Sequence, residues 1–361
     1  MLTYGGGSIK KSGLYQRVIK ALEGLEVTEL PGIAPNPKID SVREGQRLTQ
    51  KLNTDVILAV GGGSVIDASK VIGSAYFYQG DPWDLVVDAK KRNSLDQLPV
   101  VDILTIAATG TEMNNAAVIS NPDLNKKIGT FGPKTPAVSF LDPTQTFTVS
   151  KYQTAAGSID IFSHLTEQYF DRAMTEPMDN MIEGLMRAVI KYAPIAIAEP
   201  ENYDARGSLM ISATMALNGL FRSGRENSWT CHSIEHELSA FYDITHGVGL
   251  GILTLCWMKK VFEDPSTHAK MAKAGRNVWN IQGDSDTEVA SKTIQAVYDW
   301  VKSLGVPTTL PDVGINSAEH FEEMATSAVN QANLSEKAYV KLSPDDVVKL
   351  YQASMSTNGF E

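Results

Sequence analysis

Apolar and polar positions follow two different rhythms along the chain. Up to about residue 148, short apolar runs alternate with amphipathic helical patterns. The clearest run, Val56–Val60, is continuously apolar and rich in β-branched residues, as in a strand buried on both faces. Three glycines follow it, and Ser64–Ile72 then has helical spacing. Further strands are predicted at Val100–Ala107 and Ala137–Leu141, and this alternation is typical of a βαβ sheet domain.

Beyond about Thr148 the period becomes that of helices, with glycine and proline between them. Six helical stretches are predicted: Ala155–Phe170, Met178–Ile197, Ala205–Leu220, Asn227–Phe241, Val248–Phe262 and Ser291–Leu304. The pattern therefore predicts an α/β domain over residues 1–148, of the kind that binds dinucleotides, and an all-α domain over residues 149–361.

Composition narrows the class of protein. The 361 residues are 43% hydrophobic and 20% charged, as in an ordinary globular protein with a large core. The net charge of -10 argues against a nucleic acid or an anionic membrane as partner, because both attract basic surfaces. A local basic pocket for phosphate remains compatible with this charge.

Cysteine usage and the N-terminus indicate the compartment. The two cysteines, Cys231 and Cys256, exclude a disulfide framework and a cysteine-rich zinc site. The chain has no apolar run long enough to span a membrane, and its first residues lack the apolar core of a signal peptide. We therefore expect a cytoplasmic protein with reduced cysteines.

Two glycine triplets suggest phosphate binding. Gly5–Ser8 and Gly61–Ser64 each read Gly-Gly-Gly-Ser before a predicted helix. Glycine lets the backbone approach a ligand closely, and a helix N-terminus offers free N–H groups to phosphate. Neither triplet is the usual GxGxxG fingerprint, and each alone could be a tight turn. Two in one α/β domain favour phosphate binding, without identifying the cofactor.

Histidines and one aspartate cluster in the helical half. Four of the six histidines fall in two segments, and Asp160 and His164 are four residues apart, as are His232 and His236. Residues at this spacing share one helix face. With His246, which follows ten residues after His236, they offer imidazoles and a carboxylate suited to Zn²⁺ or Fe²⁺. The alternative is a set of satisfied polar pairs, and spacing alone assigns no activity.

Taken in order, these segments resemble the iron-containing (group III) alcohol dehydrogenase family, in particular its butanol-dehydrogenase-like, aldehyde-reducing branch. The motifs that carry the resemblance span nearly the whole chain: PNP (Pro35–Pro37), GGGSVIDASK (Gly61–Lys70), TIAATGTEMNN (Thr105–Asn115), LDP (Leu141–Pro143), GSIDIFSHLTEQY (Gly157–Tyr169) and HSIEHELSAFYDITHG (His232–Gly247). The family usually opens with a further strand and glycine turn, whereas this chain starts almost inside the strand that leads into Gly5.

The resemblance implies a fold and a set of site residues. The fold would be a Rossmann-like α/β domain and an all-α domain, the dehydroquinate synthase-like architecture, with the active site in the cleft between them. The family's metal ligands correspond to Asp160, His164, His232 and His246. His236 corresponds to a histidine near the metal, and we hypothesise that it relays the proton. The positions that border the cofactor correspond to Gly5, Gly6, Ser8, Gly61, Gly62, Gly63, Ser64, Asp67, Thr105, Thr109, Asn114 and Lys126.

The resemblance also leads to a hypothesis about cofactor choice. Enzymes that select NAD commonly place an acidic residue after a strand, where it repels a 2′-phosphate. In the family this position follows the strand that reads MLTY here, and it is occupied by Gly5, with Lys10 and Lys11 close behind. We therefore expect NADP(H) to be preferred over NAD(H), although some relatives use NADH.

Further expectations come from the resemblance alone. We expect short to medium aliphatic alcohols and aldehydes as substrates, one Fe²⁺ or Zn²⁺ per chain, and a homodimer, the commonest closed assembly.

Three other functions fit the sequence less well. A lyase similar to dehydroquinate synthase would need several Lys and Arg near the metal helices, and residues 157–170 and 229–247 contain neither. A metallohydrolase would leave the glycine loops unexplained, and a non-catalytic metal scaffold would bind no dinucleotide.

Overall fold

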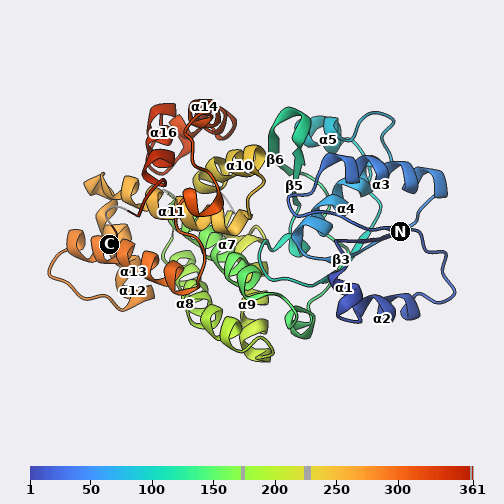
Figure 1. Ribbon diagram of the computed structural model, residues 1–361, viewed down its shortest axis with the longest axis horizontal. Helices are drawn as coiled ribbons and strands as arrows, with labels where there is room; N and C mark the ends of the chain where they lie inside the picture. The colour runs from blue at the N-terminus through green and yellow to red at the C-terminus, as the bar shows by residue number, and fades with distance from the viewer. Residues whose placement is uncertain (172–174, 223–228, 358–359, 361) are drawn as a thin grey trace. The chain divides into compact units, whose positions relative to one another are not determined.

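A computed structural model describes residues 1–171, 175–222, 229–357 and 360. Contacts within the chain divide it into two units (Figure 1), one formed by Met1–Val149 with Pro200–Asn218 and the other by Ser150–Glu199 with Gly219–Glu361. The first unit contains a parallel sheet and the second is built of helices. The predicted fold class is confirmed.

The sheet of the first unit has five parallel strands in the order β2-β1-β3-β4-β7. Their bounds are Leu2–Tyr4 (β1), Glu29–Leu30 (β2), Ile57–Gly61 (β3), Val100–Leu104 (β4) and Val138–Phe140 (β7). The three strands predicted from apolar runs correspond to β3, β4 and β7, and the prediction for β4 ran three residues too far. Because all five strands are parallel, the loops that follow β1, β3 and β4 leave the sheet at one edge, the edge where ligands bind in such folds.

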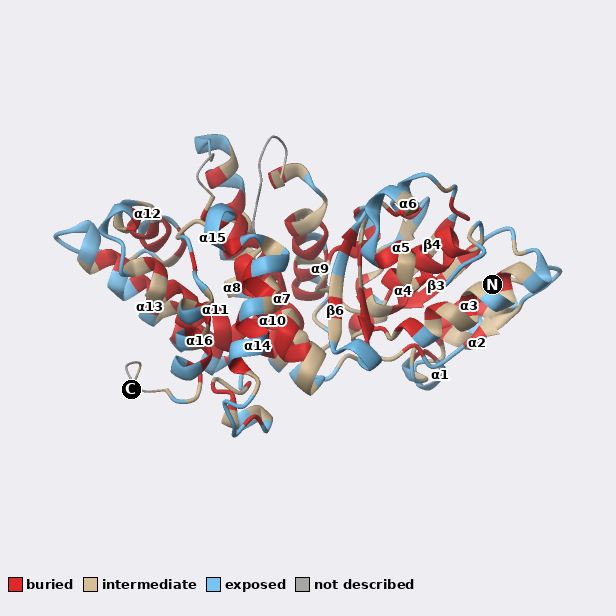
Figure 2. Cartoon of the chain, turned by 90° about the horizontal axis from the view of Figure 1, so that it is seen from above, coloured by how far each residue is buried: buried red, intermediate tan, exposed pale blue. Residues whose placement is uncertain are grey.

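Helices cover both faces of this sheet. They are α1 (Ser8–Lys11), α2 (Leu14–Ala21), α3 (Ile39–Leu52), α4 (Gly63–Ala75), α5 (Trp83–Val87), α6 (Ala89–Asn93) and α9 (Tyr203–Leu217). Neighbouring residues of β3 belong to separate cores, because Ala59 packs with the α3 and α4 side and Val60 with the α1 and α2 side. This two-sided burial explains why β3 is continuously apolar. Figure 2 shows α4 and β3 in red, as buried elements.

An antiparallel hairpin completes the first unit. Its strands are β5 (Ala116–Asn121) and β6 (Lys126–Phe131), joined by a short 3₁₀ turn (Pro122–Leu124). The segment between β4 and the hairpin contains a second 3₁₀ turn, η1 (Thr111–Met113), which packs against α4.

The second unit consists of helices around a buried central helix. Its members are α7 (Lys151–Tyr169), α8 (Glu176–Ala198), α10 (Thr230–Tyr242), α11 (His246–Phe262), α12 (His268–Trp279), α13 (Asp286–Ser303), α14 (Phe321–Ala332), α15 (Leu334–Lys337) and α16 (Pro344–Ala353). Helix α7 starts at an N-cap, Ser150, and every residue from Thr154 to Tyr169 is buried. A helix buried on all sides that still carries Asp160, His164 and Glu167 is a place to look for function.

One predicted helix falls partly outside the described residues. The predicted stretch Asn227–Phe241 corresponds to α10, and its first two residues lie outside the described residues. Among the described helices, none is both long and apolar enough to cross a membrane.

Candidate metal centre and cofactor loops

Three helices of the second unit bring Asp160, His164, His232 and His246 together. Asp160 and His164 lie one turn apart on α7, and His232 lies in the first turn of α10. Helix α10 ends at Tyr242, the next residue, Asp243, has a left-handed backbone (φ 49°) that turns the chain, and His246 is the first residue of α11. The turn between α10 and α11 therefore places His246 beside His164 and His232.

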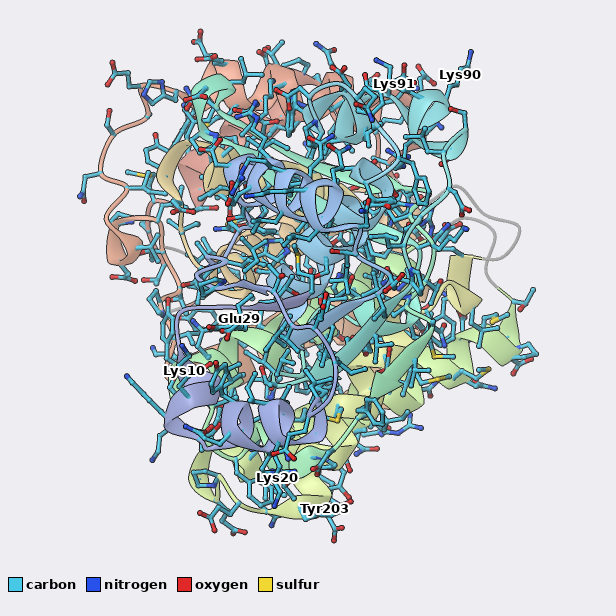
Figure 3. The ribbon with its side chains drawn as sticks, turned by 90° about the vertical axis from the view of Figure 1, so that its right-hand side faces the viewer. Lys10, Lys20, Glu29, Lys90, Lys91 and Tyr203 are labelled. Carbon is cyan, nitrogen blue, oxygen red and sulfur yellow. The ribbon has the colours of Figure 1, made fainter. Side chains whose placement is uncertain are left out.

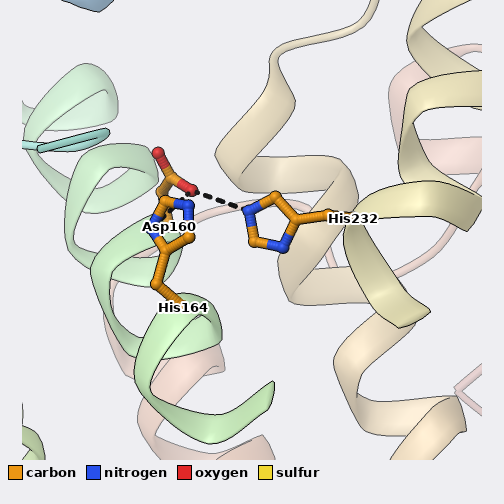
Figure 4. Close-up of side chains that lie close together, drawn as sticks. All are labelled: Asp160, His164 and His232. Atoms are coloured by element: carbon orange, nitrogen blue, oxygen red, sulfur yellow. Dashed lines mark ion pairs between the residues drawn. The ribbon is translucent and has the colours of Figure 1, made fainter. Parts of the chain in front are cut away.

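Figure 4 shows three of the four side chains, Asp160, His164 and His232, lying close together. Oδ1 of Asp160 lies 3.5 Å from Nδ1 of His164, 3.5 Å from Nε2 of His232 and 3.8 Å from Nε2 of His246. Oδ1 of Asp160, Nδ1 of His164 and Nε2 of His232 are buried and have no hydrogen-bond partner among the described residues. Buried polar atoms without partners are costly unless a ligand satisfies them. The donor set fits a divalent cation.

The ionisation of the cluster also suits a cation. Burial alone would raise the pKa of Asp160, but the nearby histidines, His164 foremost, outweigh burial and hold the pKa below its ordinary value. Burial lowers the pKa of His164 to about 3, so its imidazole is neutral. Burial acts in the same direction on His232, but the carboxylates of Glu167 and Asp160 prevail and raise its pKa to about 10. The cluster thus offers an ionised carboxylate and imidazoles whose protons a metal ion would displace.

Sequence reasoning missed two carboxylates at this site. Glu167 on α7 contacts Nδ1 of His232, and Glu235 on α10 contacts Nδ1 of His246. The side chains of Glu167 and Glu235 are 1% and 0% exposed. Glu167 lies seven residues after Asp160, two turns along the same helix face, and this spacing is the signal that could have identified it.

His236 and Trp229 border the cluster. The ring of His236 is half-buried, and its centroid lies 5.5 Å from that of His246 and 6.3 Å from that of His232. The indole of Trp229 packs edge-on against His164 and His232 at 5.8 and 5.5 Å. The second unit therefore places one further histidine and one aromatic wall beside the four converging residues.

In the first unit, both glycine triplets join a strand to a helix. Gly5–Ser8 connects β1 to α1, and Gly7 has the left-handed φ of 108° that favours glycine. Gly61–Ser64 connects β3 to α4. A Cβ added at Gly63 would lie 2.3 Å from Oγ1 of Thr109, so glycine allows the loop after β4 to approach the start of α4. Thr105 lies in the same loop and donates its backbone N–H to Gly61 O at 3.0 Å.

A buried network fixes the rest of this loop. The wholly buried Lys70 of α4 donates to Thr111 Oγ1 (2.7 Å), Asn114 O (2.9 Å), Asn114 Oδ1 (3.2 Å) and Ala116 O (2.8 Å). Asp67, one turn earlier, accepts from Thr111 and from Val118 N (2.8 Å). Asp67 and Asn114 thus hold the loop to α4, and Lys126 lies at the start of β6.

Replacing Lys70 by methionine is expected to change how stability depends on pH. Burial, opposed by Asp67, Glu112 and Asp102, lowers the pKa of Lys70 from 10.5 to about 8. Between these values the unfolded chain binds more protons, so Lys70 makes the free energy of unfolding rise with pH, by at most about 1.4 kcal/mol per pH unit. Lys70→Met lacks this contribution. The difference in unfolding free energy, parent minus variant, should therefore be larger at about pH 9.5 than at about pH 7.5 in urea titrations. The same difference in unfolding free energy at both pH values would contradict a lowered pKa of Lys70.

Near the glycine triplet Gly5–Gly7, the carboxylate of Glu29 lies in the same cluster of side chains as Lys10. Tyr4 and Tyr15 donate their hydroxyls to Glu29 at 2.5 and 2.7 Å, and these hydrogen bonds lower the pKa of Glu29. The ammonium of Lys10 lies 5.1 and 4.7 Å from the centroids of the two rings. Lys10 and Glu29, both labelled in Figure 3, come from α1 and β2. Glu29 offsets part of the positive charge that Lys10 brings to this unit.

Comparison with known proteins supplies the context for this geometry. Residues 1–143 match the family model described as iron-containing alcohol dehydrogenase, and residues 154–355 match the model of the C-terminal domain of that family. The chain is 42% identical over 359 residues to NADH-dependent butanol dehydrogenase A of Clostridium acetobutylicum, covering 98% of this chain and 91% of that protein. It is 37% identical to the NADPH-dependent aldehyde reductase YqhD of Escherichia coli, covering 88% and 82%.

Solved structures agree in fold. The crystal structure of NADH-dependent butanol dehydrogenase A from Thermotoga maritima superposes with a TM-score of 0.91 at 37% identity, covering 98% of this chain and 90% of that one.

Proposed function

The chain belongs to the iron-containing alcohol dehydrogenase family, and we propose that the four converging side chains of its helical unit hold the metal ion of that chemistry. The protein is an oxidoreductase, an alcohol dehydrogenase or aldehyde reductase that uses a nicotinamide cofactor and a metal ion. We propose in addition which residues bind the metal ion and the cofactor, which cofactor is preferred and which substrates are used.

Asp160, His164, His232 and His246 are the proposed ligands of one Fe²⁺ or Zn²⁺. The observation that carries this assignment is that all three histidine rings place a nitrogen within 3.8 Å of Oδ1 of Asp160. Oδ1 of Asp160, Nδ1 of His164 and Nε2 of His232 are buried and have no hydrogen-bond partner among the described residues. When bound, the ion supplies Lewis acidity that stabilises negative charge on the substrate oxygen. The edge of Trp229 beside two of the ligands keeps part of the surroundings apolar, which suits short to medium aliphatic substrates.

The remaining residues bind, orient and move a proton. The N-terminus of α4 and the Gly61–Ser64 turn offer backbone N–H groups to the pyrophosphate of the dinucleotide. Asp67, Thr105, Thr109, Asn114 and Lys126 are the proposed neighbours of the same cofactor, with Gly5, Gly6 and Ser8 at its adenosine end. His236, half-buried and beside His246, is the proposed proton carrier for the substrate hydroxyl, because imidazole titrates near neutral pH.

For the cofactor we propose NADP(H) in preference to NAD(H). The turn after β1 presents Gly5 where an acidic residue would repel a 2′-phosphate, with Lys10 nearby. Relatives are named for either cofactor, since the butanol dehydrogenases are called NADH-dependent and YqhD NADPH-dependent. Family membership therefore leaves the choice open, and the glycine in place of an acidic residue argues for NADP(H), although Glu29 offsets part of the charge of Lys10.

Aldehyde reduction that requires metal is the expected activity. Purified protein given butanal should consume NADPH, measured by the loss of absorbance, and a chelator should stop the reaction until divalent metal is restored. The same assay with NADH and a series of aldehydes ranks cofactors and substrates. NADPH oxidation that persists after the metal has been removed would rule out a catalytic metal centre.

The assembly is proposed to be a homodimer, as two-fold dimers are the commonest closed assemblies. Light scattering at micromolar concentration should give twice the chain mass of 39.2 kDa; the mass of a single chain would refute the dimer.

We also propose that residues 1–148 bind the dinucleotide and residues 149–361 carry the metal. A cytoplasmic location is supported by two buried cysteines that form no disulfide.

A further inference from the structure

The three histidines of the centre are held in different ways. His232 and His246 each direct Nε2 toward Asp160 while Nδ1 contacts a buried carboxylate, Glu167 for the first and Glu235 for the second. His164 directs Nδ1 toward Asp160 instead, at 3.5 Å. Two of the three imidazoles therefore contact a buried carboxylate through the ring nitrogen that is not directed toward Asp160.

The carboxylates determine which nitrogen of each ring is free. A neutral imidazole carries one N–H and one lone pair. A carboxylate accepts hydrogen bonds only, so its contact with Nδ1 keeps the proton on Nδ1 and leaves the lone pair on Nε2. In both histidines Nε2 is the atom that faces Asp160. Glu167 and Glu235 thus select the tautomer that a cation needs.

Glu167 has a second role in the backbone. Its other oxygen, Oε2, accepts the N–H of Cys231 at 2.7 Å and lies 3.4 Å from the N–H of His232. These N–H groups belong to the first turn of α10, whose N-cap residue, Trp229, supplies no side-chain cap. A carboxylate of α7 therefore caps α10 and ties the helix of Asp160 and His164 to the helix of His232.

Glu235 acts over a shorter range. It belongs to α10 itself, accepts the hydroxyl of Ser239 one turn later, and contacts the first residue of α11. Its contact with His246 joins α10 to α11 across the turn at Asp243. Both carboxylates thus contact a histidine, and Glu167 in addition caps α10.

Charge adds to the effect of geometry. Glu167 and Glu235 place two further buried carboxyl groups beside the carboxyl group of Asp160. Extra negative charge in a medium of low dielectric constant strengthens the retention of a cation.

We propose that Glu167 and Glu235 are positioning residues that set the affinity of the metal centre by fixing the Nδ1–H tautomers of His232 and His246. This inference rests on the proposed assignment of the metal ligands. Loss of such a partner typically weakens metal binding roughly 10- to 100-fold.

The test is a Co²⁺ titration of the full chain after metal removal, with a competing chelator and visible absorption as the readouts. Glu167→Gln and Glu235→Gln remove charge while conserving size. Glu183→Gln is the matched control, because Glu183 is equally buried and hydrogen-bonded, to Tyr169 (2.7 Å) and Asn277 (2.9 Å), and contacts no ligand. We expect weaker Co²⁺ binding, roughly 10- to 100-fold, in the first two variants and parental affinity in the third, even where Glu183→Gln lowers the melting temperature.

The outcomes separate this inference from the assignment of the ligands. Parent protein that binds no Co²⁺ would overturn the metal centre and the inference together. Stoichiometric binding by the parent, with unchanged affinity and Co²⁺ spectrum in both glutamine variants, would overturn the inference alone. An equal loss in Glu183→Gln would show that the effect is only one of stability. If Glu167→Gln does not fold, Glu235→Gln decides the question, since it changes the partner of His246 and leaves the contact of Glu167 with the first turn of α10 in place.

Discussion

Replacing His232 by alanine is expected to abolish turnover and metal binding while leaving the fold intact. His232 supplies one of four converging side chains, and its Nε2 is among the buried atoms that have no hydrogen-bond partner in the described part of the chain. Removing a ligand outright should cost more than the roughly 100-fold that losing an outer partner costs. Elemental analysis, steady-state rates with butanal and circular dichroism measure the three quantities.

Controls separate the loss of a ligand from general damage. His268 lies on α12, where it hydrogen-bonds to Thr287 and to the Phe262 carbonyl, so His268→Ala should keep its metal and its rate. His246 is more exposed than His232, 22% against 9%, and His246→Ala should repeat the loss with less disturbance of the core. Full activity in metal-free His232→Ala would disprove the ligand assignment.

A charge placed at Gly5 is expected to reverse the preference for cofactor. In Gly5→Asp the new carboxylate should repel a 2′-phosphate and accept the ribose hydroxyl of NADH. Two unit charges about 4 Å apart near a protein surface interact by roughly 1–4 kcal/mol, or roughly five- to several-hundredfold in kcat/KM. A Cβ at Gly5 would lie 3.3 Å from the Ile33 carbonyl oxygen and 3.9 Å from Cγ2 of Val65, so the turn must shift by a few tenths of an ångström to accept a side chain.

The measurement compares kcat/KM for NADPH and NADH with one aldehyde. Gly5→Asn has nearly the same size without the charge and should keep the parental preference. Preference for NADH in the parent would show that the NADP(H) proposal is wrong. Equal shifts in the aspartate and asparagine variants would show that size, and not charge, acts at this turn.

Local patterns predicted much of the fold. Strand β3 could be identified because burial on both faces requires a continuous apolar run, and α7 because its helical spacing is unbroken over five turns. The apolar residues Ile106 and Ala107 extend the predicted strand beyond Leu104, whereas the chain has already left the sheet at Thr105, whose N–H bonds to Gly61 O. Helix α9 reads like its neighbours in the helical half, yet its contacts are with the first unit, where Thr214 bonds to Glu112. No local pattern encodes which unit a helix joins.

The sequence by itself determined the residue types of the candidate centre and their spacing within each helix. Asp160/His164 and His232/His236 share helix faces because i and i+4 residues always do. Only the tertiary structure decided that His232 and His246, from two different helices, turn nitrogen atoms to within 4 Å of the Asp160 carboxylate. It also decided that Glu167 and Glu235 hold these rings, and that Lys70 lies inside the first unit. The physical reason is that hydrogen bonds and charge act over a few ångströms in space, whereas helical and strand periodicity reports only on neighbours along the chain.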